Sequence, residues 1–278
     1  MGIAIQRFDP DRIAAVGRLF PGEIDADPWI MFHGTSGFNA KSIERDGFTF
    51  QPNFISHDQI KRVTNVYEMM KWAGESGGGC AVLKPFSLDH DFLYGGRGLL
   101  FFAESSVRAL LFATRDFSGG EKLRALRIAF CDLDSYLAHS EVRERHMERM
   151  SREFRTLTQP NAHPSTIEAA RPVQVDLDWL RNEMVNLRDI RQIADAAYLR
   201  HDHGVVYALQ MTSDDLGGLG WNSSMGIEAA TPIPASKIVA KIVVPPDYKQ
   251  NLFAKDEERG RRVTLEVGLI AAIRARVR

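Results

Sequence analysis

The stretch that decides the fold reads MFHGTSGFNAKSIERDGF, from Met31 to Phe48. An apolar run ends here at His33, as a buried strand does before a turn. The letters FNAKSIERD that follow have apolar residues at helical spacing, and Gly47 is suited to end a helix. The stretch therefore predicts a strand at about 29–33 and then a short helix.

His33 lies at the end of that apolar run. A single histidine in such a place is most often a structural residue whose ring nitrogens bond to backbone groups. Its neighbours favour a second interpretation, because Gly34 lets a ligand come close to the backbone and Thr35 adds a hydroxyl group. The next helix contributes free N–H groups at its start. Together these groups predict a polar site at the end of the strand.

A second strand end carries two adjacent aromatic residues, in the stretch GLLFFAESSVRALLFA. A strand at about 99–103 delivers Phe101 and Phe102, and Ser105 or Ser106 is suited to cap the helix that follows. Side chains alternate along a strand, so only one of the two rings faces a given cleft and the other belongs to the core. The ring that faces the cleft is suited to stack on a flat heterocycle.

The third stretch is WNSSMGIEAATPIPASKIVAKIVVP, in which Glu228 has no charged neighbour for several residues. A surface glutamate ordinarily lies among other charged residues. Glu228 instead lies between a loop rich in glycine and serine and Pro232. This isolation predicts a functional carboxylate at a strand edge, and a solvated loop glutamate is the alternative.

The remaining sequence sets the expected architecture. Further strands are predicted at about 124–131, 204–210 and 237–244. The last segment, from about 261 onward, fits either a strand or an amphipathic helix. Helical and strand patterns alternate irregularly, so we expect an α+β fold whose sheet halves enclose a cleft, not a doubly wound sheet.

A charged helical region is expected within this fold. From about 135 to 198 the sequence shows long charged patterns with helical spacing. We interpret this region as a helical insertion into a single domain that spans residues 1–278. Its exposed face is either a solvated flank or a surface that recognises a target.

Composition excludes several classes of protein. The 278 residues include 35 lysines and arginines and 36 aspartates and glutamates, which gives a formal charge of -1. This balance argues against binding of nucleic acid through bulk charge. The beginning of the chain lacks the apolar core of a signal peptide, and no apolar run is long enough to span a membrane. The two cysteines, Cys80 and Cys131, do not have the spacing of metal ligands. We therefore expect a cytoplasmic protein without a membrane partner, with secretion as an effector left open.

The three motifs occur in an order shared with a known superfamily. The chain resembles the ADP-ribosyltransferases, in the branch with a histidine, an aromatic residue and a glutamate. That branch includes poly(ADP-ribose) polymerases, diphtheria-type toxins and RNA 2′-phosphotransferases. FHGTSGFNAKSIERDGF looks like its first motif, and ATPIPASKIVAKIVVP is similar to the segment after its glutamate. The likeness, which runs in outline from Trp29 to Pro245, implies a split mixed β-sheet core with flanking helices and an enzyme, toxin or effector of bacterial type.

The resemblance implies that NAD is the co-substrate. His33 would bond to the 2′-hydroxyl of the nicotinamide ribose, and Gly34 would hold the nicotinamide amide through its backbone. Thr35 would support the same end of NAD. Ser105 and Ser106, at the start of the helix after the aromatic strand, would add to the residues that bind NAD.

The resemblance also assigns the chemistry. Phe101 or Phe102 would stack on the nicotinamide ring. Glu228 would hold the ribose hydroxyl and stabilise positive charge as the bond between ribose and nicotinamide breaks. The leaving group is neutral nicotinamide, so no metal is implied.

Two departures from the family pattern refine this expectation. Phenylalanine replaces the usual tyrosine, which keeps stacking and removes a hydroxyl group. Gly226 stands where arginine-modifying members carry a second glutamate. We therefore expect transfer of ADP-ribose to an acceptor other than arginine, a protein or a nucleic acid of unknown identity, or to water.

Two alternatives stay open from the sequence. An RNA 2′-phosphotransferase would use the same cleft and would need basic residues that converge on a phosphate, for which Arg45, Arg97, Arg108 and Arg115 are candidates. A catalytically inactive module would bind a nucleotide or a protein partner. The missing tyrosine favours such a module, and the joint presence of His33 and Glu228 argues against it.

Overall fold

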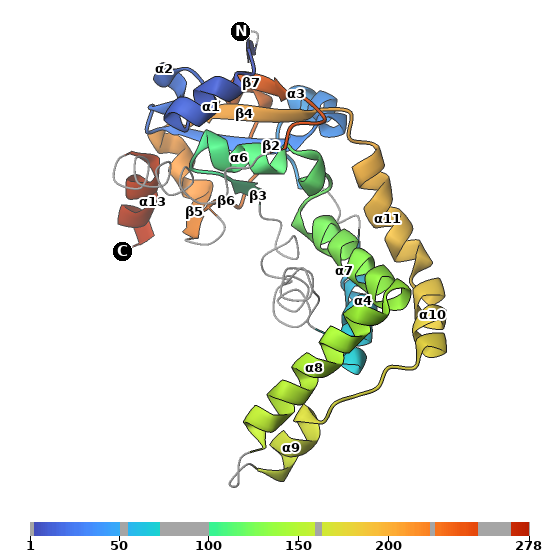
Figure 1. Cartoon of the computed structure of the whole chain (residues 1–278). Coiled ribbons are helices and arrows are strands. Elements are labelled where there is room, and N and C mark those ends of the chain that lie inside the picture. The colour runs from blue at the N-terminus through green and yellow to red at the C-terminus, as the bar shows by residue number, and fades with distance from the viewer. Residues whose placement is uncertain are drawn as a thin grey trace. The chain divides into compact units, whose positions relative to one another are not determined.

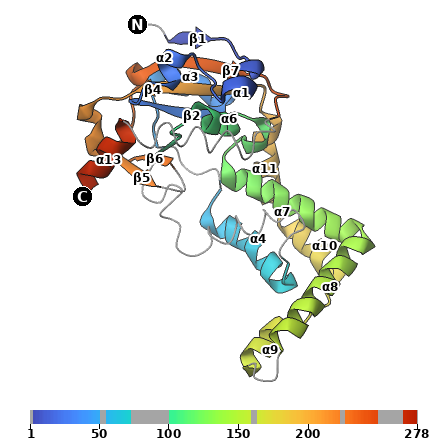
Figure 2. The same cartoon turned by 60° about the vertical axis from the view of Figure 1, so that its left-hand side comes forward.

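A computed structural model describes residues 3–50, 55–72, 100–158, 163–222, 226–249 and 268–277. Figures 1 and 2 show its helices and strands from two directions. In chain order the elements are β1 (Ala4–Gln6), α1 (Pro10–Val16), α2 (Gly22–Asp25), β2 (Ile30–Ser36), α3 (Ala40–Asp46), α4 (His57–Met70), β3 (Leu100–Phe102), α6 (Ser106–Phe112), α7 (Glu121–Ala138), α8 (Ser140–Leu157), α9 (Pro164–Ala170), α10 (Leu177–Asn186), α11 (Arg188–Leu199), β4 (Gly204–Gln210), β5 (Leu219–Asn222), β6 (Gly226–Ala229), β7 (Ile238–Val244) and α13 (Leu269–Val277).

The chain divides into two compact units. The first, here called the sheet unit, comprises Met1–Asn53, His90–Arg124 and Ala196–Arg278. The second, the helical unit, comprises Phe54–Asp89 and Ala125–Asp195. All described strands belong to the sheet unit, so the expected α+β class is confirmed for the described residues.

The sheet unit contains two sheets. A four-stranded sheet has the order β1-β7-β4-β2, in which β1 runs parallel to β7 and the other neighbours are antiparallel. A three-stranded antiparallel sheet has the order β3-β6-β5. This mixed topology excludes a parallel doubly wound sheet.

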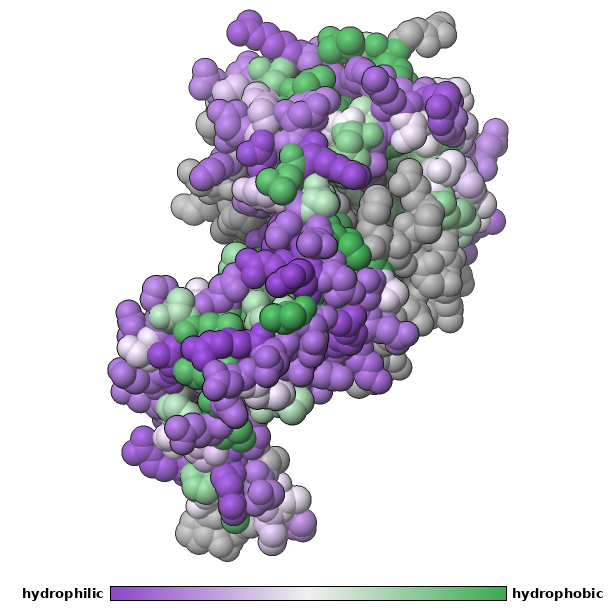
Figure 3. Space-filling model, turned by 90° about the vertical axis from the view of Figure 1, so that its right-hand side faces the viewer, coloured by the Kyte–Doolittle hydropathy of each residue, from purple (hydrophilic) through white to green (hydrophobic). Residues whose placement is uncertain are grey.

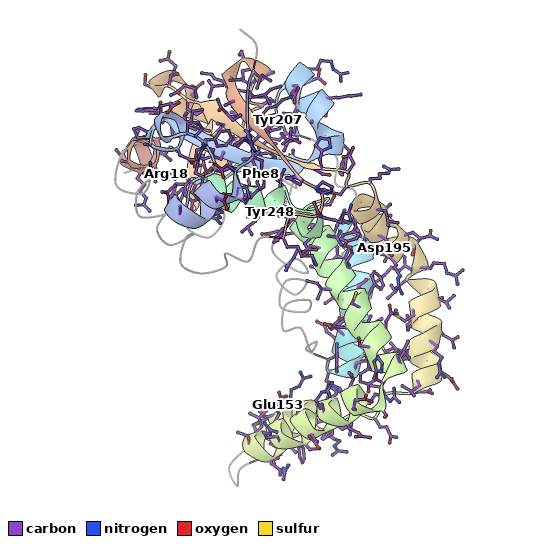
Figure 4. All side chains as sticks on the ribbon, turned by 45° about the horizontal axis from the view of Figure 1, so that its top comes forward. Phe8, Arg18, Glu153, Asp195, Tyr207 and Tyr248 are labelled. Carbon is purple, nitrogen blue, oxygen red and sulfur yellow. The ribbon has the colours of Figure 1, made fainter. Side chains whose placement is uncertain are left out.

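Each face of the four-stranded sheet carries its own core. Residues of α6 and of the segment after α1, such as Leu110 and Phe20, pack on one face against Phe32 and Val206. Phe8 and Tyr248 pack edge to face at 4.9 Å beside this core (Figure 4). On the other face, α3, α13 and the smaller sheet bury a second set of apolar side chains, including Met31, Ile43, Phe102, Tyr207, Ile227 and Ile273.

Helix α6 lies against the four-stranded sheet (Figures 1 and 2). Two glycines of the sheet allow this close approach. A Cβ atom on Gly34 would lie 1.7 Å from the carbonyl oxygen of Ala109, and one on Gly204 would lie 1.8 Å from that of Ala113. Real Cβ atoms do not come so close to backbone atoms, so both positions require glycine for this packing. Gly34 therefore has a structural role on the face that α6 covers.

The N-terminal segment anchors the start of α6 through a buried carboxyl group. The Ser106 hydroxyl accepts a hydrogen bond from the Leu19 N–H at 3.0 Å and interacts with Asp25, which also accepts from the Phe20 N–H at 2.5 Å. Burial raises the pKa of Asp25 to about 6, although these hydrogen bonds and nearby Arg18 oppose the change. The loop after α1 and the end of α2 are thus tied to α6.

The helical unit has an aromatic core of its own. Trp72 contacts the rings of Tyr136 and His146, with centroids 5.1 and 4.7 Å apart. The Tyr67 hydroxyl donates to the Ala129 carbonyl oxygen at 2.9 Å, which ties α4 to α7. A few large apolar side chains of this unit, such as Leu157, are exposed, and the face drawn in Figure 3 is mostly hydrophilic.

The structure corrects one expected strand. Residues 124–131 belong to α7, an 18-residue helix, and not to a strand. Leu123, Leu126, Phe130 and Leu133 are buried, at the spacing of one helix face. The helical unit includes α4, and its second segment, Ala125–Asp195, contains most of the region 135–198.

Other expected elements agree with the structure. Strands β2, β3, β4 and β7 occupy the predicted places, and Gly47 ends α3 with a φ of 81°. The sequence pattern of the last segment fits either a strand or a helix. Its described part forms the helix α13. The short strands β1, β5 and β6 were not predicted. Cys80 and Arg97 lie outside the described residues.

The glycine contacts generate a stability prediction. Replacing Gly34 with alanine forces the new methyl group into the backbone of α6, so we expect the free energy of unfolding to fall by about 3 kcal/mol. Gly22→Ala is the matched control, because the nearest atom to its new Cβ is the end of the Arg18 side chain at 3.9 Å. Urea denaturation measures both variants, and equal stabilities would contradict the packing described for α6.

A second prediction concerns pH. The folded pKa of Asp25 lies above its ordinary value of 3.8, so its contribution to stability is complete below pH 3.8 and is lost as the pH rises through about 6. The Asp25→Asn variant should lack this contribution, which is about 3 kcal/mol at most. The difference in unfolding free energy between wild type and Asp25→Asn, measured from pH 4 to 7, should therefore shrink. A difference that stays constant over this pH range would refute the assignment.

Candidate functional site

The two sheets of the sheet unit meet at one backbone bridge and then diverge. Phe32 in β2 donates to the Ala103 carbonyl oxygen at 2.9 Å and accepts from the Ala103 N–H at 2.7 Å. The antiparallel register would next place Gly34 opposite Phe101, but among the described residues the pairing ends at this bridge. The residues predicted for the site lie on either side of this point of divergence.

His33 reaches across the divergence to the other sheet. Its Nδ1 atom lies 3.0 Å from the Phe101 carbonyl oxygen. A carbonyl oxygen only accepts, so Nδ1 carries the proton and donates it. The other ring nitrogen, Nε2, then holds a lone pair in the neutral ring. His33 is thus a hydrogen-bond acceptor at Nε2, where the described residues provide no partner.

Aromatic side chains surround the half-buried His33 ring. The ring centroids of Phe48 and Phe102 lie 4.8 and 5.4 Å from that of His33. Burial lowers the pKa of His33 to about 4, against the opposing effect of the hydrogen bond to Phe101. The imidazole therefore stays neutral at physiological pH.

The strand register separates the two phenylalanines of β3. Phe101 is the cross-strand partner of Glu228, and Phe102 is the partner of Ile227. Phe102 is only 2% exposed and belongs to the core with Ile227, whereas Phe101 is partly exposed. Cross-strand partners point to the same face of a sheet, so the Phe101 ring shares its face with the Glu228 side chain. The sequence does not determine which of the two rings faces the site. In the structure, Phe101 is the one beside Glu228.

Glu228 lies in the central strand of the smaller sheet. It is half-buried between Phe101 on one side and Gly220 on the other. Within the described part of the chain, its carboxylate has no hydrogen-bond or ion-pair partner. His33 bonds to the backbone of Phe101, and Phe101 pairs with Glu228, so the backbone of β3 links these three predicted residues. The His33 ring itself packs on Phe102, which points to the opposite face of β3 from Phe101.

Gly34 and Thr35 lie next to His33 in β2. Backbone groups alternate in direction along a strand, so the N–H and C=O of Gly34 point to the same side as those of Phe32, toward the divergence. The side of Gly34 on which a side chain would project is covered by α6. The Thr35 hydroxyl accepts from the Asn39 amide at 3.0 Å and Thr35 is 8% exposed. Gly34 thus offers its backbone edge, and Thr35 is engaged in holding the turn before α3.

Ser105 and Ser106 have structural partners. Ser105 is the N-cap of α6 and accepts from the Arg108 N–H at 3.2 Å. Ser106 is turned toward Leu19 and Asp25. Both serines are buried at the start of α6, where these contacts engage their hydroxyl groups.

Several residues around the site were missed by sequence reasoning. Phe48 packs on His33, and Tyr207 is the cross-strand partner of His33 and lies within the sheet (Figure 4). The carboxylate of Glu44 accepts from the Tyr207 hydroxyl at 3.0 Å and from the Lys241 ammonium at 2.6 Å, which ties α3 to the sheet. The only sequence signal for Phe48 was its place directly after the helix-ending Gly47.

A buried ion pair lies beside the start of β6. Arg108 donates to both carboxylate oxygens of Glu104 at 3.0 Å, and the Glu104 side chain is fully buried. An oxygen of Glu104 lies 3.4 Å from where a Cβ on Gly226 would be. Gly226 itself has a φ of 98°. The start of the strand that carries Glu228 therefore lies close to this buried pair.

Comparisons with known proteins do not identify this site. No family model, no curated protein and no solved structure matches the chain. Among the described residues, no group of three potential metal ligands gathers in one place. None of the described helices combines the length and the apolar character that crossing a membrane requires.

The geometry of His33 predicts a spectroscopic result. Nitrogen NMR of the eight histidines should show one ring with Nδ1 protonated and Nε2 bare at pH 7, and with a pKa of about 4. His146 also has a pKa lowered by burial to about 4, so the His33→Gln variant identifies the signal. A His33 ring protonated at Nε2, or one that titrates at its ordinary pKa of 6.5, would contradict the arrangement.

Proposed function

We propose that the protein is an NAD-dependent ADP-ribosyltransferase that cleaves the bond between nicotinamide and ribose. The observation that carries this proposal is the hydrogen bond from His33 to Phe101 together with the pairing of Phe101 with Glu228. Through the backbone of β3 it links a neutral acceptor, an aromatic ring and a carboxylate that has no partner among the described residues. These are the groups that a nicotinamide riboside requires.

Binding follows from the chemistry of each group. Nicotinamide in NAD is a flat ring with positive charge, which stacks favourably on the face of a phenyl ring such as Phe101. Its carboxamide has a donor and an acceptor that match the backbone N–H and C=O of Gly34. The ribose hydroxyl donates to the lone pair on His33 Nε2. No cation is needed for these contacts.

Bond cleavage follows from the carboxylate. When the bond from the ribose C1′ to nicotinamide breaks, the electron pair leaves with nicotinamide, which becomes neutral, and positive charge develops on the ribose. Glu228 stabilises this charge, because a carboxylate already in place loses little energy to reorganisation. The acceptor then bonds to C1′ and releases a proton. The interaction with Glu228 strengthens as the bond breaks, which is the condition for catalysis.

The surroundings of Glu228 bear on the acceptor. Gly226 lies on the same face of β6 and has no side chain that could orient a guanidinium group. The nearby carboxylate of Glu104 is fully buried and bonded to Arg108, so it is not offered to an acceptor. These features support an acceptor other than arginine, such as another protein side chain, a nucleic acid or water.

Of the four arginines that the sequence offers to an RNA 2′-phosphotransferase, the three that are described have other partners. Arg45 bonds to Asp46, Arg108 bonds to Glu104, and Arg115 donates to the His201 carbonyl oxygen. Each of the three is engaged at a different place in the sheet unit. An inactive binding module would use the same residues as the transferase, so catalysis has to be measured to separate the two.

The proposal predicts different effects for the two polar side chains. Glu228→Gln should bind NAD almost as tightly as wild type, and its rate of nicotinamide release should fall about a hundredfold or more. His33→Ala should weaken NAD binding about tenfold, because its hydrogen bond already exists in bound NAD. Calorimetry measures the binding, and a nicotinamide-release assay measures the turnover.

Glu23→Gln serves as the control, since Glu23 is exposed on α2. Equal turnover by wild type and Glu228→Gln would disprove the catalytic role of Glu228. Binding of NAD without release by the wild type, with protein and nucleic acid acceptors present, would instead identify an inactive module.

A further inference from the structure

The orientation of the His33 ring depends on more than one contact. Its hydrogen bond to Phe101 holds one atom, and a ring held at one atom can still tilt. Phe48 contacts the ring at an interplanar angle of 66°, and Phe102 contacts it at 58°. Phe48 and Phe102 also touch each other, with centroids 5.2 Å apart. The imidazole is therefore enclosed by two rings that support one another.

Phe48 is itself firmly placed. Its N–H donates to the Ile233 carbonyl oxygen at 2.8 Å, and its carbonyl oxygen accepts from the Ile233 N–H at 3.0 Å. Gly47, directly before it, adopts a φ of 81° that favours glycine, and a Cβ there would lie 2.3 Å from the Ile233 oxygen. Phe48 is 4% exposed, and its ring centroid lies 5.8 Å from that of Tyr207. Both the backbone and the ring of Phe48 are thus fixed.

We propose that Phe48 is a positioning residue, which holds the His33 imidazole so that Nε2 faces the ribose of NAD. This inference rests on the proposed function. Phe48 does not touch the reacting atoms in this account, and it acts through His33. An error of about 1 Å in the position of such a group can cost about a hundredfold in rate.

The test compares two substitutions of the same kind in opposite cores. Phe48→Leu removes the ring beside His33. Phe20→Leu removes a fully buried ring from the other face of the four-stranded sheet, where Phe20 stacks on Phe32 at 5.7 Å. Both variants should lose stability, so loss of stability alone does not distinguish them. Should Phe48→Leu fail to fold, Phe48→Met, which is closer in volume, replaces it.

Two measurements distinguish positioning from packing. In Phe48→Leu, water gains access to the imidazole, so the NMR-measured pKa of His33 should rise by about one unit or more. The ratio kcat/KM for nicotinamide release should fall at least about tenfold, with part of the loss in KM. In Phe20→Leu, the pKa of His33 should stay unchanged and kcat/KM should stay within about twofold of wild type.

The outcomes separate this inference from the proposed function. If the wild type releases no nicotinamide, the proposed function fails, and the positioning role fails with it. If the wild type is active and Phe48→Leu leaves either the His33 pKa or kcat/KM unchanged, only the role of Phe48 is overturned. Equal changes in both readouts for Phe20→Leu would likewise overturn it.

Discussion

The close packing of α6 on β2 and β4 is the contact on which the sheet unit depends. Gly34 and Gly204 leave room for the carbonyl groups of Ala109 and Ala113, so the backbones of helix and sheet come close at these two positions. The strand β3 runs almost directly into α6, with Ser105 as the cap. The position of α6 therefore sets the position of β3 relative to β2.

The candidate site is a consequence of that arrangement. Strands β2 and β3 share the bridge between Phe32 and Ala103 and then diverge, because β3 pairs with β6 in the smaller sheet. Because the strands diverge, the backbone of Gly34 and the carbonyl oxygen of Phe101 do not bond to each other. His33 satisfies the Phe101 oxygen, and this one hydrogen bond determines both its tautomer and its remaining lone pair. Glu228 joins the site through the register of β3 and β6.

The sequence was informative where local chemistry determined the outcome. The apolar runs of β4 and β7 and the helix-ending Gly47 gave the expected elements nearly in place. The prediction of a strand at 124–131 was wrong, because the apolar residues there fit both a strand and one face of a helix. Tertiary packing stabilises the helix α7 instead. The choice between Phe101 and Phe102, the enclosure of His33 by Phe48 and the buried pair of Glu104 and Arg108 all depend on register and long-range contacts. No local pattern encodes these.

The central claim is that His33, Gly34, Phe101 and Glu228 form one site for the nicotinamide end of NAD. Titration of NAD into nitrogen-labelled protein, followed by amide chemical shifts, tests it most directly. We expect the largest shifts at Gly34, Phe101 and Glu228, which lie on three strands of the sheet unit, and small shifts in α8. Saturation with NAD that leaves these three amides unmoved, or that moves α8 most, would contradict the account.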